Sequence, residues 1–144
     1  MKTFKKVTFA FIILIIAITS FSSCKKGTDD PVISLKTRKD RITNTWYLVK
    51  YEKNGVNQDT SGSSYVYSIA SNGTLTRTVQ GVIFGFPTRT VTNGTWTFLN
   101  DDEDIQITID SKAVVYGIQR LATKELWLKE IVGTDTYIYY FNGN

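Results

Sequence analysis

The sequence has no histidine, only two prolines and a single cysteine, Cys24, in 144 residues. Without histidine, the chain cannot use an imidazole base or a histidine-ligated metal. One cysteine cannot form a disulfide within the chain, so a disulfide-stapled fold is excluded. The chain does not lack apolar residues, because 42% of it is hydrophobic and 13% aromatic. These values predict one domain with a substantial core.

The first 23 residues have the features of a secretory signal. Lys2, Lys5 and Lys6 precede an uncharged stretch that is apolar throughout from Phe9 to Ile18. A basic segment followed by such an apolar segment is typical of a signal peptide, and it is shorter than the about 20 residues of a membrane span. We therefore predict a signal peptide over residues 1–23.

The segment Phe21-Ser22-Ser23-Cys24 places small residues directly before the only cysteine. It resembles the lipobox of bacterial lipoproteins, with Phe21 where Leu is usual. The resemblance implies that Cys24 is lipidated and becomes the new N-terminus, which would anchor the protein stably in a membrane. The expected location is the bacterial cell envelope, at the outer membrane, facing the periplasm or the surface. The alternative is an incidental thiol after an ordinary signal peptide.

Little charge remains once the signal segment is removed. The net charge of +4 falls to +1 when three lysines leave with residues 1–23. No run of Lys and Arg with interleaved aromatics remains, so we expect no nucleic-acid partner. The carboxylate cluster Asp101-Asp102-Glu103-Asp104 does not match the spacing of a calcium loop and predicts a solvated turn. We predict no metal, no cofactor and no enzymatic activity, although Asp110 or Glu125 could in principle act as an acid or base.

Residues 24–41 are expected to form a lipidated tether and a short helix. The polar residues 25–30 predict a flexible spacer between the lipid and the domain. Leu35 and Ile42 lie seven positions apart, which predicts one short helix from Ser34 to Ile42. We expect this helix to close one end of the domain.

Residues 42–144 have the composition of an all-β domain. Alanine is scarce, whereas threonine, tyrosine and tryptophan are abundant. Turn residues such as Asn54-Gly55 and Asn72-Gly73 separate short alternating segments. This pattern predicts an eight-stranded antiparallel up-and-down barrel, and a two-layer sandwich is the alternative. The expected strands are 43–53, 64–70, 74–80, 88–99, 104–110, 113–121, 125–131 and 136–141.

Five short motifs occur in a regular order along this domain. Together they resemble the lipocalin-like domain of small bacterial lipoproteins, a calycin-type β-barrel, over about residues 42–142. The resemblance implies a closed or nearly closed barrel and no particular ligand. The motifs are Asn44–Tyr51, Ile69–Leu75, Asn93–Phe98, Glu125–Lys129 and Tyr137–Phe141.

Alternation along each strand predicts which side chains face inward. Ile105, Ile107 and Ile109 alternate with polar residues and mark the clearest strand. Several tyrosines share the inward parity, and a buried hydroxyl without a partner costs about 1–3 kcal/mol. The interior is therefore expected to be partly wet or occupied. The other residues expected inside are Trp46, Leu48, Tyr65, Tyr67, Ile69, Leu75, Trp96, Phe98, Val114, Tyr116, Ile118, Leu126, Leu128, Tyr137, Tyr139 and Phe141.

Two cations share the inward parity, Arg77 with Leu75 and Lys50 with Leu48. A buried guanidinium must be paired, and no inward carboxylate is evident on the neighbouring strands. We predict a cup that holds a small apolar or amphipathic ligand, with an acidic head near Arg77. The alternatives are a bulge that turns Arg77 to solvent or a salt bridge on the rim. The predicted ligand-binding residues are Lys50, Tyr65, Tyr67, Arg77, Tyr116, Tyr137 and Tyr139.

The segment Gly81–Pro87 is unusually apolar for a loop. It could form a lid over the open end with glycine hinges, or fold back and plug the barrel. The predicted lid residues are Val82, Ile83, Phe84 and Phe86.

An apolar stripe is expected on the outer face, because the first and last strands are neighbours in a closed barrel. Such a stripe predicts an interface with a protein partner or a second copy, unless Val32, Ile33 and Leu35 cover it. A non-catalytic interaction subunit of an envelope complex is therefore the alternative to a binding barrel. The stripe residues are Tyr47, Val49, Tyr51, Trp127, Ile138 and Tyr140.

Overall fold

The computed structural model describes residues 30–31 and 35–144. The predicted signal peptide, the predicted lipidation of Cys24 and most of the predicted tether lie outside these residues, as do Val32 and Ile33. No helix within the described ranges is long and apolar enough to cross a membrane.

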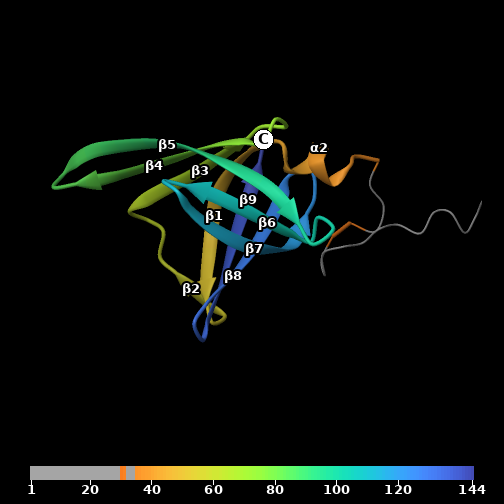
Figure 1. The fold of residues 1–144 in the computed structure, drawn as a ribbon. Helices are drawn as coiled ribbons and strands as arrows, with labels where there is room; N and C mark the ends of the chain where they lie inside the picture. The colour runs from red at the N-terminus through yellow and green to blue at the C-terminus, as the bar shows by residue number, and fades with distance from the viewer. Residues whose placement is uncertain (1–29, 32–34) are drawn as a thin grey trace, which may run out of the picture.

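The described residues form an antiparallel sheet that closes into an eight-stranded barrel (Figure 1). Strand β1 pairs with β2 and β3, each strand from β3 onward pairs with the next, and β1 also pairs with β9, which closes the sheet. The prediction of an all-β, eight-stranded antiparallel barrel with a short N-terminal helix is confirmed, and the sandwich alternative is wrong. The elements are α2 (Arg38–Ile42), β1 (Thr45–Lys53), β2 (Val56–Gln58), β3 (Ser63–Ile69), β4 (Thr74–Ile83), β5 (Phe86–Leu99), β6 (Asp104–Ile109), β7 (Lys112–Leu121), β8 (Glu125–Val132) and β9 (Asp135–Gly143).

Each predicted strand corresponds to one strand of the barrel, and β2 is an addition. Asn54 and Gly55 have φ angles of 51° and 79°, which is the conformation of a two-residue hairpin turn. The chain therefore reverses after β1, and β2 pairs only with residues 51–53 at the end of β1. Strand β2 therefore lies along the same edge of β1 as β3, past the residues of β1 that pair with β3.

Helix α2 lies at one end of the barrel, which we call the closed end. Thr37 caps the helix, and its side chain and that of Asp40 bond reciprocally to the backbone in a capping box. The helix therefore begins at Arg38 and not at Ser34, and Leu35 is fully exposed. Ile42 packs in the core, and its carbonyl accepts a hydrogen bond of 2.8 Å from the Trp46 indole nitrogen.

Asp30 docks onto the closed end, which corrects the prediction that residues 25–30 are all flexible spacer. Its side chain is buried, pairs with Arg38, and accepts a hydrogen bond of 2.6 Å from the Leu121 backbone nitrogen. A buried carboxylate held by a backbone donor and a guanidinium is a fixed point of the chain. The chain segment before α2 is thus attached to the end of β7.

One residue of β1 has no partner on β9. Leu48 lies opposite Phe141 and the next pair is Lys50 with Tyr140, so Val49 is the extra residue of a β-bulge. Because side chains alternate with period two, one extra residue exchanges the inner and outer faces of everything that follows it in the strand.

The bulge corrects two predictions. Tyr51, expected on the outer face, lines the interior of the barrel. Lys50, expected inside, lies on the outer face, where its ammonium nitrogen is 4.7 Å from the centre of the Tyr140 ring. Lys50 is therefore not a residue of the interior, and Tyr51 does not belong to the outer stripe.

The segment Gly81–Pro87 is not a loop but the tip of a long hairpin. Strand β4 continues to Ile83, and β5 begins at Phe86 after a two-residue turn in which Phe84 has a φ angle of 51°. The tip projects beyond the barrel, and Phe84 is 96% exposed (Figure 1). The interpretation of this segment as a plug is wrong, and its role as a lid stays a prediction.

Gly94 permits the close approach of β6 to β5. A Cβ atom there would lie 2.3 Å from the Thr108 carbonyl oxygen and 2.8 Å from the Ile109 side chain. We expect Gly94→Ala to lower the free energy of unfolding by about 1–3 kcal/mol, measured by urea unfolding followed by tryptophan fluorescence.

Gly117→Ala is the matched control, because its Cβ would meet no atom closer than 3.6 Å. It should leave stability unchanged or raise it slightly, since alanine restricts the unfolded chain. Equal stabilities of the two variants would show that the contact at Gly94 carries no constraint.

Candidate ligand-binding site

The inner side chains change from apolar to polar along the barrel. At the closed end, Trp46, Leu75 and Leu126 are almost completely buried. We call the opposite end the open end. Toward it, the next inward-facing residue after Leu75 on β4 is Arg77, and the next after Leu128 on β8 is Glu130. The tight core therefore occupies one end, and a polar chamber occupies the other.

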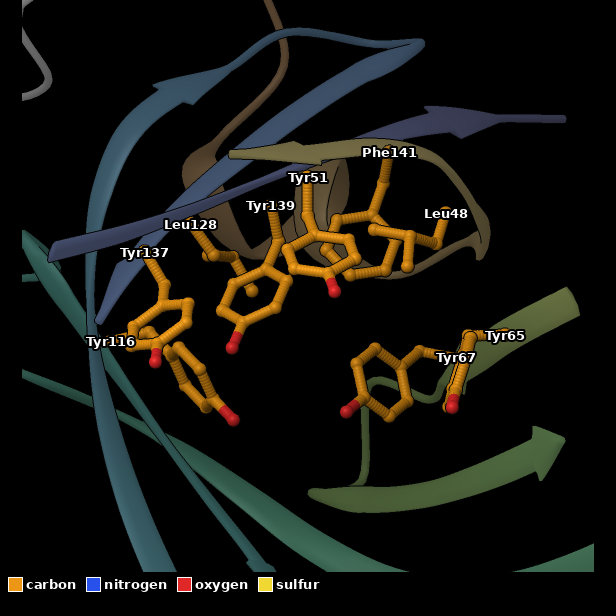
Figure 2. A pocket seen from close by; sticks show the side chains of 9 residues that line it. All are labelled: Leu48, Tyr51, Tyr65, Tyr67, Tyr116, Leu128, Tyr137, Tyr139 and Phe141. Atoms are coloured by element: carbon orange, nitrogen blue, oxygen red, sulfur yellow. The ribbon is translucent and has the colours of Figure 1, made fainter. Parts of the chain in front are cut away.

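A pocket of about 360 Å³ lies inside the barrel toward the open end. Figure 2 shows Tyr51, Tyr137 and Tyr139 on one wall of this pocket, with Tyr65 and Tyr67 across from them. The structure thus brings five of the predicted ligand-binding tyrosines to one pocket, together with Tyr51. The full lining is Leu48, Tyr51, Tyr65, Tyr67, Tyr116, Leu128, Tyr137, Tyr139 and Phe141.

Tyr139 is the centre of the aromatic wall. Its ring stacks on Tyr51 at 5.9 Å and on Tyr137 at 6.4 Å, and it meets the Tyr116 ring edge-on at 6.1 Å. These separations lie in the range of favourable aromatic pairs. The wall is therefore a set of mutually supported rings with their hydroxyl groups at the edge of an open space (Figure 2).

A second pocket, of about 420 Å³, shares Tyr67 and Tyr116 with the first. Its lining includes cationic and acidic side chains, whereas the first pocket is lined only by tyrosines and apolar residues. The two pockets together form a chamber with an aromatic part and a charged part. The charged residues are Arg77, Asp110, Lys112 and Glu130.

Arg77 lines the charged part of the chamber. The pairing of β4 with β3 and with β5 runs without a register shift, so no bulge turns Arg77 outward. Its terminal nitrogen lies 4.0 Å from a carboxylate oxygen of Asp110, whose side chain is 73% exposed. The Nε of Arg77 is buried and has no hydrogen-bond partner in the structure. The guanidinium is therefore only weakly paired.

The prediction about inward carboxylates considered only the strands next to Arg77, and it missed Glu130, which points inward from β8. Glu130 accepts a hydrogen bond of 3.0 Å from the Tyr139 hydroxyl and lines the same pocket as Arg77. Glu130 has the same parity as Leu126 and Leu128, so the alternation of β8 was sufficient to find it.

Burial favours the neutral form of three inner tyrosines. Desolvation raises the pKa of Tyr67 and of Tyr116 above the ordinary value. Desolvation also raises the pKa of Tyr139, with a further contribution from its bond to Glu130. A neutral phenol donates and accepts hydrogen bonds without charge. These three phenols therefore offer polar contacts to a bound molecule but no anionic base at neutral pH.

The outer stripe is partly covered by cations. Trp127 and Tyr140 meet edge-on at 5.2 Å, Arg120 lies 5.4 Å from the Trp127 ring, and Lys50 covers Tyr140. Such contacts give each ring a charged neighbour and reduce the bare apolar surface. Leu35 does not cover the stripe, because it is fully exposed. A partner at this face stays a prediction.

Two ion pairs hold the cations of the stripe in place. Lys50 bonds Glu52 at 2.7 Å, and Arg120 bonds Glu125 at 2.6 Å. The bonds from Lys50 and Tyr140 lower the pKa of Glu52.

The described part of the chain contains no group of three or more His, Cys, Asp or Glu side chains that could hold a metal ion.

Alkaline pH should destabilise the folded chain. The ordinary tyrosine pKa of about 10 applies to the unfolded chain, whereas burial raises the pKa of Tyr116 in the folded chain. At a pH between the pKa of Tyr116 in the unfolded chain and its higher pKa in the folded chain, the unfolded chain has released a proton that the folded chain keeps. The free energy of unfolding therefore falls as the pH rises.

We expect Tyr116→Phe to reduce this fall in urea unfolding at about pH 8 and about pH 11. Tyr47→Phe, at an exposed position of the outer face, should leave it unchanged. A pH dependence that is the same in Tyr116→Phe and in the unaltered chain would contradict the assignment of the fall to buried phenols.

Comparison with known proteins supports the fold. No family model matches the sequence, and no curated protein matches it. The crystal structure of a lipocalin-like protein from Bacteroides uniformis ATCC 8492 is similar, with a TM-score of 0.55 and 13% sequence identity. The match covers 72% of this chain and 99% of that chain. The chain therefore has a lipocalin-like fold, a closed eight-stranded antiparallel barrel.

Proposed function

We propose that this protein is a binding protein that holds a small amphipathic molecule in the chamber at the open end. The apolar body of the ligand lies against the tyrosine wall, and its anionic head lies at Arg77. The observation that carries the proposal is the Nε of Arg77, which is buried and has no hydrogen-bond partner. It lies next to an aromatic pocket of about 360 Å³. Ligand sites in proteins have volumes of about 300–1,000 Å³.

The unpartnered Nε of Arg77 favours an anionic head group, although the pocket holds two carboxylates beside its two cations. Asp110 is exposed and 4.0 Å away, so solvent screens its attraction to the guanidinium. Glu130 already accepts a hydrogen bond from Tyr139. Lys112 lines the same pocket and adds a second cation. A carboxylate or sulfonate would satisfy the free Nε with a charge-assisted hydrogen bond, which is stronger than a neutral one.

The proposed role is binding without catalysis. The sequence has no histidine, and the raised pKa of Tyr67 and of Tyr139 keeps both phenols protonated at neutral pH, so that neither is available as a base. The Tyr139 hydroxyl donates to Glu130 in the chamber, and the raised pKa of Tyr139 keeps the proton on this phenol. These features support a site that holds its ligand unchanged.

We expect Arg77→Gln to weaken the binding of anilinonaphthalene sulfonate about ten-fold, because one charge-assisted hydrogen bond is lost. Phenylnaphthylamine has the same apolar body without the sulfonate, so its affinity should change little. The measurement is fluorescence titration of residues 25–144, which retain Asp30 and the whole barrel.

Arg89→Gln is the matched control, because Arg89 is an exposed arginine on the neighbouring strand β5. It should bind both dyes as the unaltered chain does. Equal losses for the two dyes in Arg77→Gln, or equal losses in the two variants, would refute an anionic head group at Arg77. Failure of both dyes to bind the unaltered chain would refute the binding chamber itself.

Lipid anchoring at Cys24 is part of the same proposal, and the docking of Asp30 supports an orientation for the anchored protein. Six residues lead from Cys24 to Asp30, which span at most about 20 Å. Because Asp30 binds the end of β7 at the closed end, the lipid would hold that end near the membrane. The open end would then face away from the bilayer.

We expect a bacterial host to attach an alkyne-tagged fatty acid to the chain, and Cys24→Ser to reduce the label to background. The chain has no other cysteine, so thioester labelling elsewhere cannot mask the result. The unaltered chain should also be found in the membrane fraction. Equal labelling of the two forms, or none in either, would contradict lipidation.

A further inference from the structure

The β4–β5 hairpin leaves a long backbone edge without a partner strand. Strand β4 pairs with β5 as far as Phe86, whereas β6 pairs only with residues 94–99 of β5. Residues 86–93 of β5 therefore have β4 on one side and no strand on the other, among the residues that the structure describes. Figure 1 shows this hairpin extending well past the barrel.

The register shows which backbone groups lie on the free edge. The Trp96 nitrogen donates to the Gly73 carbonyl at 2.9 Å, which is the β4 side of β5. The pairing has no register shift from Phe86 to Thr95, and backbone groups alternate between the two sides of a strand. The N–H and C=O groups of Arg89, Val91 and Asn93 therefore point away from β4.

The usual protections of an edge strand are nearly absent here. Natural edges carry charges, prolines or bulges that prevent pairing with another chain. Pro87 protects only the distal end, and Arg89 is the single charge from Thr88 to Asn93. Threonine and valine, which favour extended strands, fill four of the six positions. The edge is therefore suited to accept a further strand.

We propose that this edge pairs with the same edge of a second copy of the chain, antiparallel, about a two-fold axis at Thr90. Such an axis places identical donors and acceptors opposite one another, so the edge is its own complement. It also sets Arg89 of one copy opposite Val91 of the other and Thr90 opposite Thr90. The two arginines are thereby kept apart, and a favourable threonine pair forms.

The exposed apolar tip supports a second copy as the occupant. In the proposed pairing, the tip of one copy lies against the turn between β6 and β7 of the other. That turn contains Asp110, which lines the charged pocket. Phe84 and Phe86, which are 96% and 74% exposed, would then lie beside the open end of the second barrel. The contact thus covers apolar surface that the single chain leaves in water.

Two substitutions at Val91 test the backbone contact. Val91→Pro removes an N–H that the β4–β5 ladder does not use, and proline is tolerated at edge positions. Val91→Thr keeps that N–H and the branched side chain. In sedimentation of the full chain in detergent, we expect concentration-dependent dimers for the unaltered chain and Val91→Thr. Dimerisation should be about ten-fold weaker for Val91→Pro, because two hydrogen bonds are lost per dimer.

Two further substitutions test the register without altering the backbone. Val91 is half exposed, so both charged replacements are compatible with folding. Val91→Glu would face Arg89 of the second copy and should strengthen the dimer, whereas Val91→Lys should weaken it, each by about three-fold. Opposite effects of the two substitutions on dimer affinity indicate the axis at Thr90. With an axis at Val91, the introduced charge would face the same charge of the second copy, and both substitutions would weaken the dimer.

Amide hydrogen exchange supplies an independent readout. The amides of Arg89 and Asn93 should be protected at high protein concentration and exchange rapidly on dilution, whereas those of Thr90 and Thr92 stay protected at both. A monomer at every concentration, or a dimer that none of the Val91 variants alters, would overturn the proposal. The N-terminal apolar segment is common to all variants, so it cannot produce a difference among them.

Discussion

The pairing of β1 with β9 is the contact on which the rest of the structure depends. It closes the sheet, so that the inner rows of eight strands face one another across a space a few side chains wide. The bulge at Val49 lies within this same pairing. It turns Tyr51 into the interior, where its ring stacks on Tyr139 at 5.9 Å. Barrel closure and the aromatic wall are thus consequences of one strand pair.

The barrel divides its interior between stability and binding. Trp46, Leu121 and Leu126 have no exposed surface at the closed end, and Asp30 and α2 cover that end. The open end can therefore hold groups that would weaken a core, such as Arg77 and Glu130. Buried polar groups without full partners lower the stability of the fold, and they persist where packing in the rest of the fold offsets this loss.

Most of the fold could be predicted from the sequence, because local alternation and turn residues report strands and faces directly. The same alternation also places Glu130 inside. The bulge at Val49 could not be predicted, since it depends on the register of β9, which lies about ninety residues away in the chain. The docking of Asp30 to Leu121 depends on a contact of similar sequence separation. The turn at Phe84 escaped detection because phenylalanine is an unusual residue in the left-handed conformation.

The chamber and the free edge share two strands, and this sharing has a thermodynamic consequence. Arg77 lies on β4 directly opposite Thr92 of β5, at the base of the projecting hairpin. A ligand at Arg77 and a second copy at the β5 edge would both restrict the same pair of strands. The first of these two binding events restricts the motion of β4 and β5, so the second has a smaller entropic cost. Ligand binding and association therefore favour each other. By linkage, the factor by which the ligand tightens association equals the factor by which association tightens ligand binding.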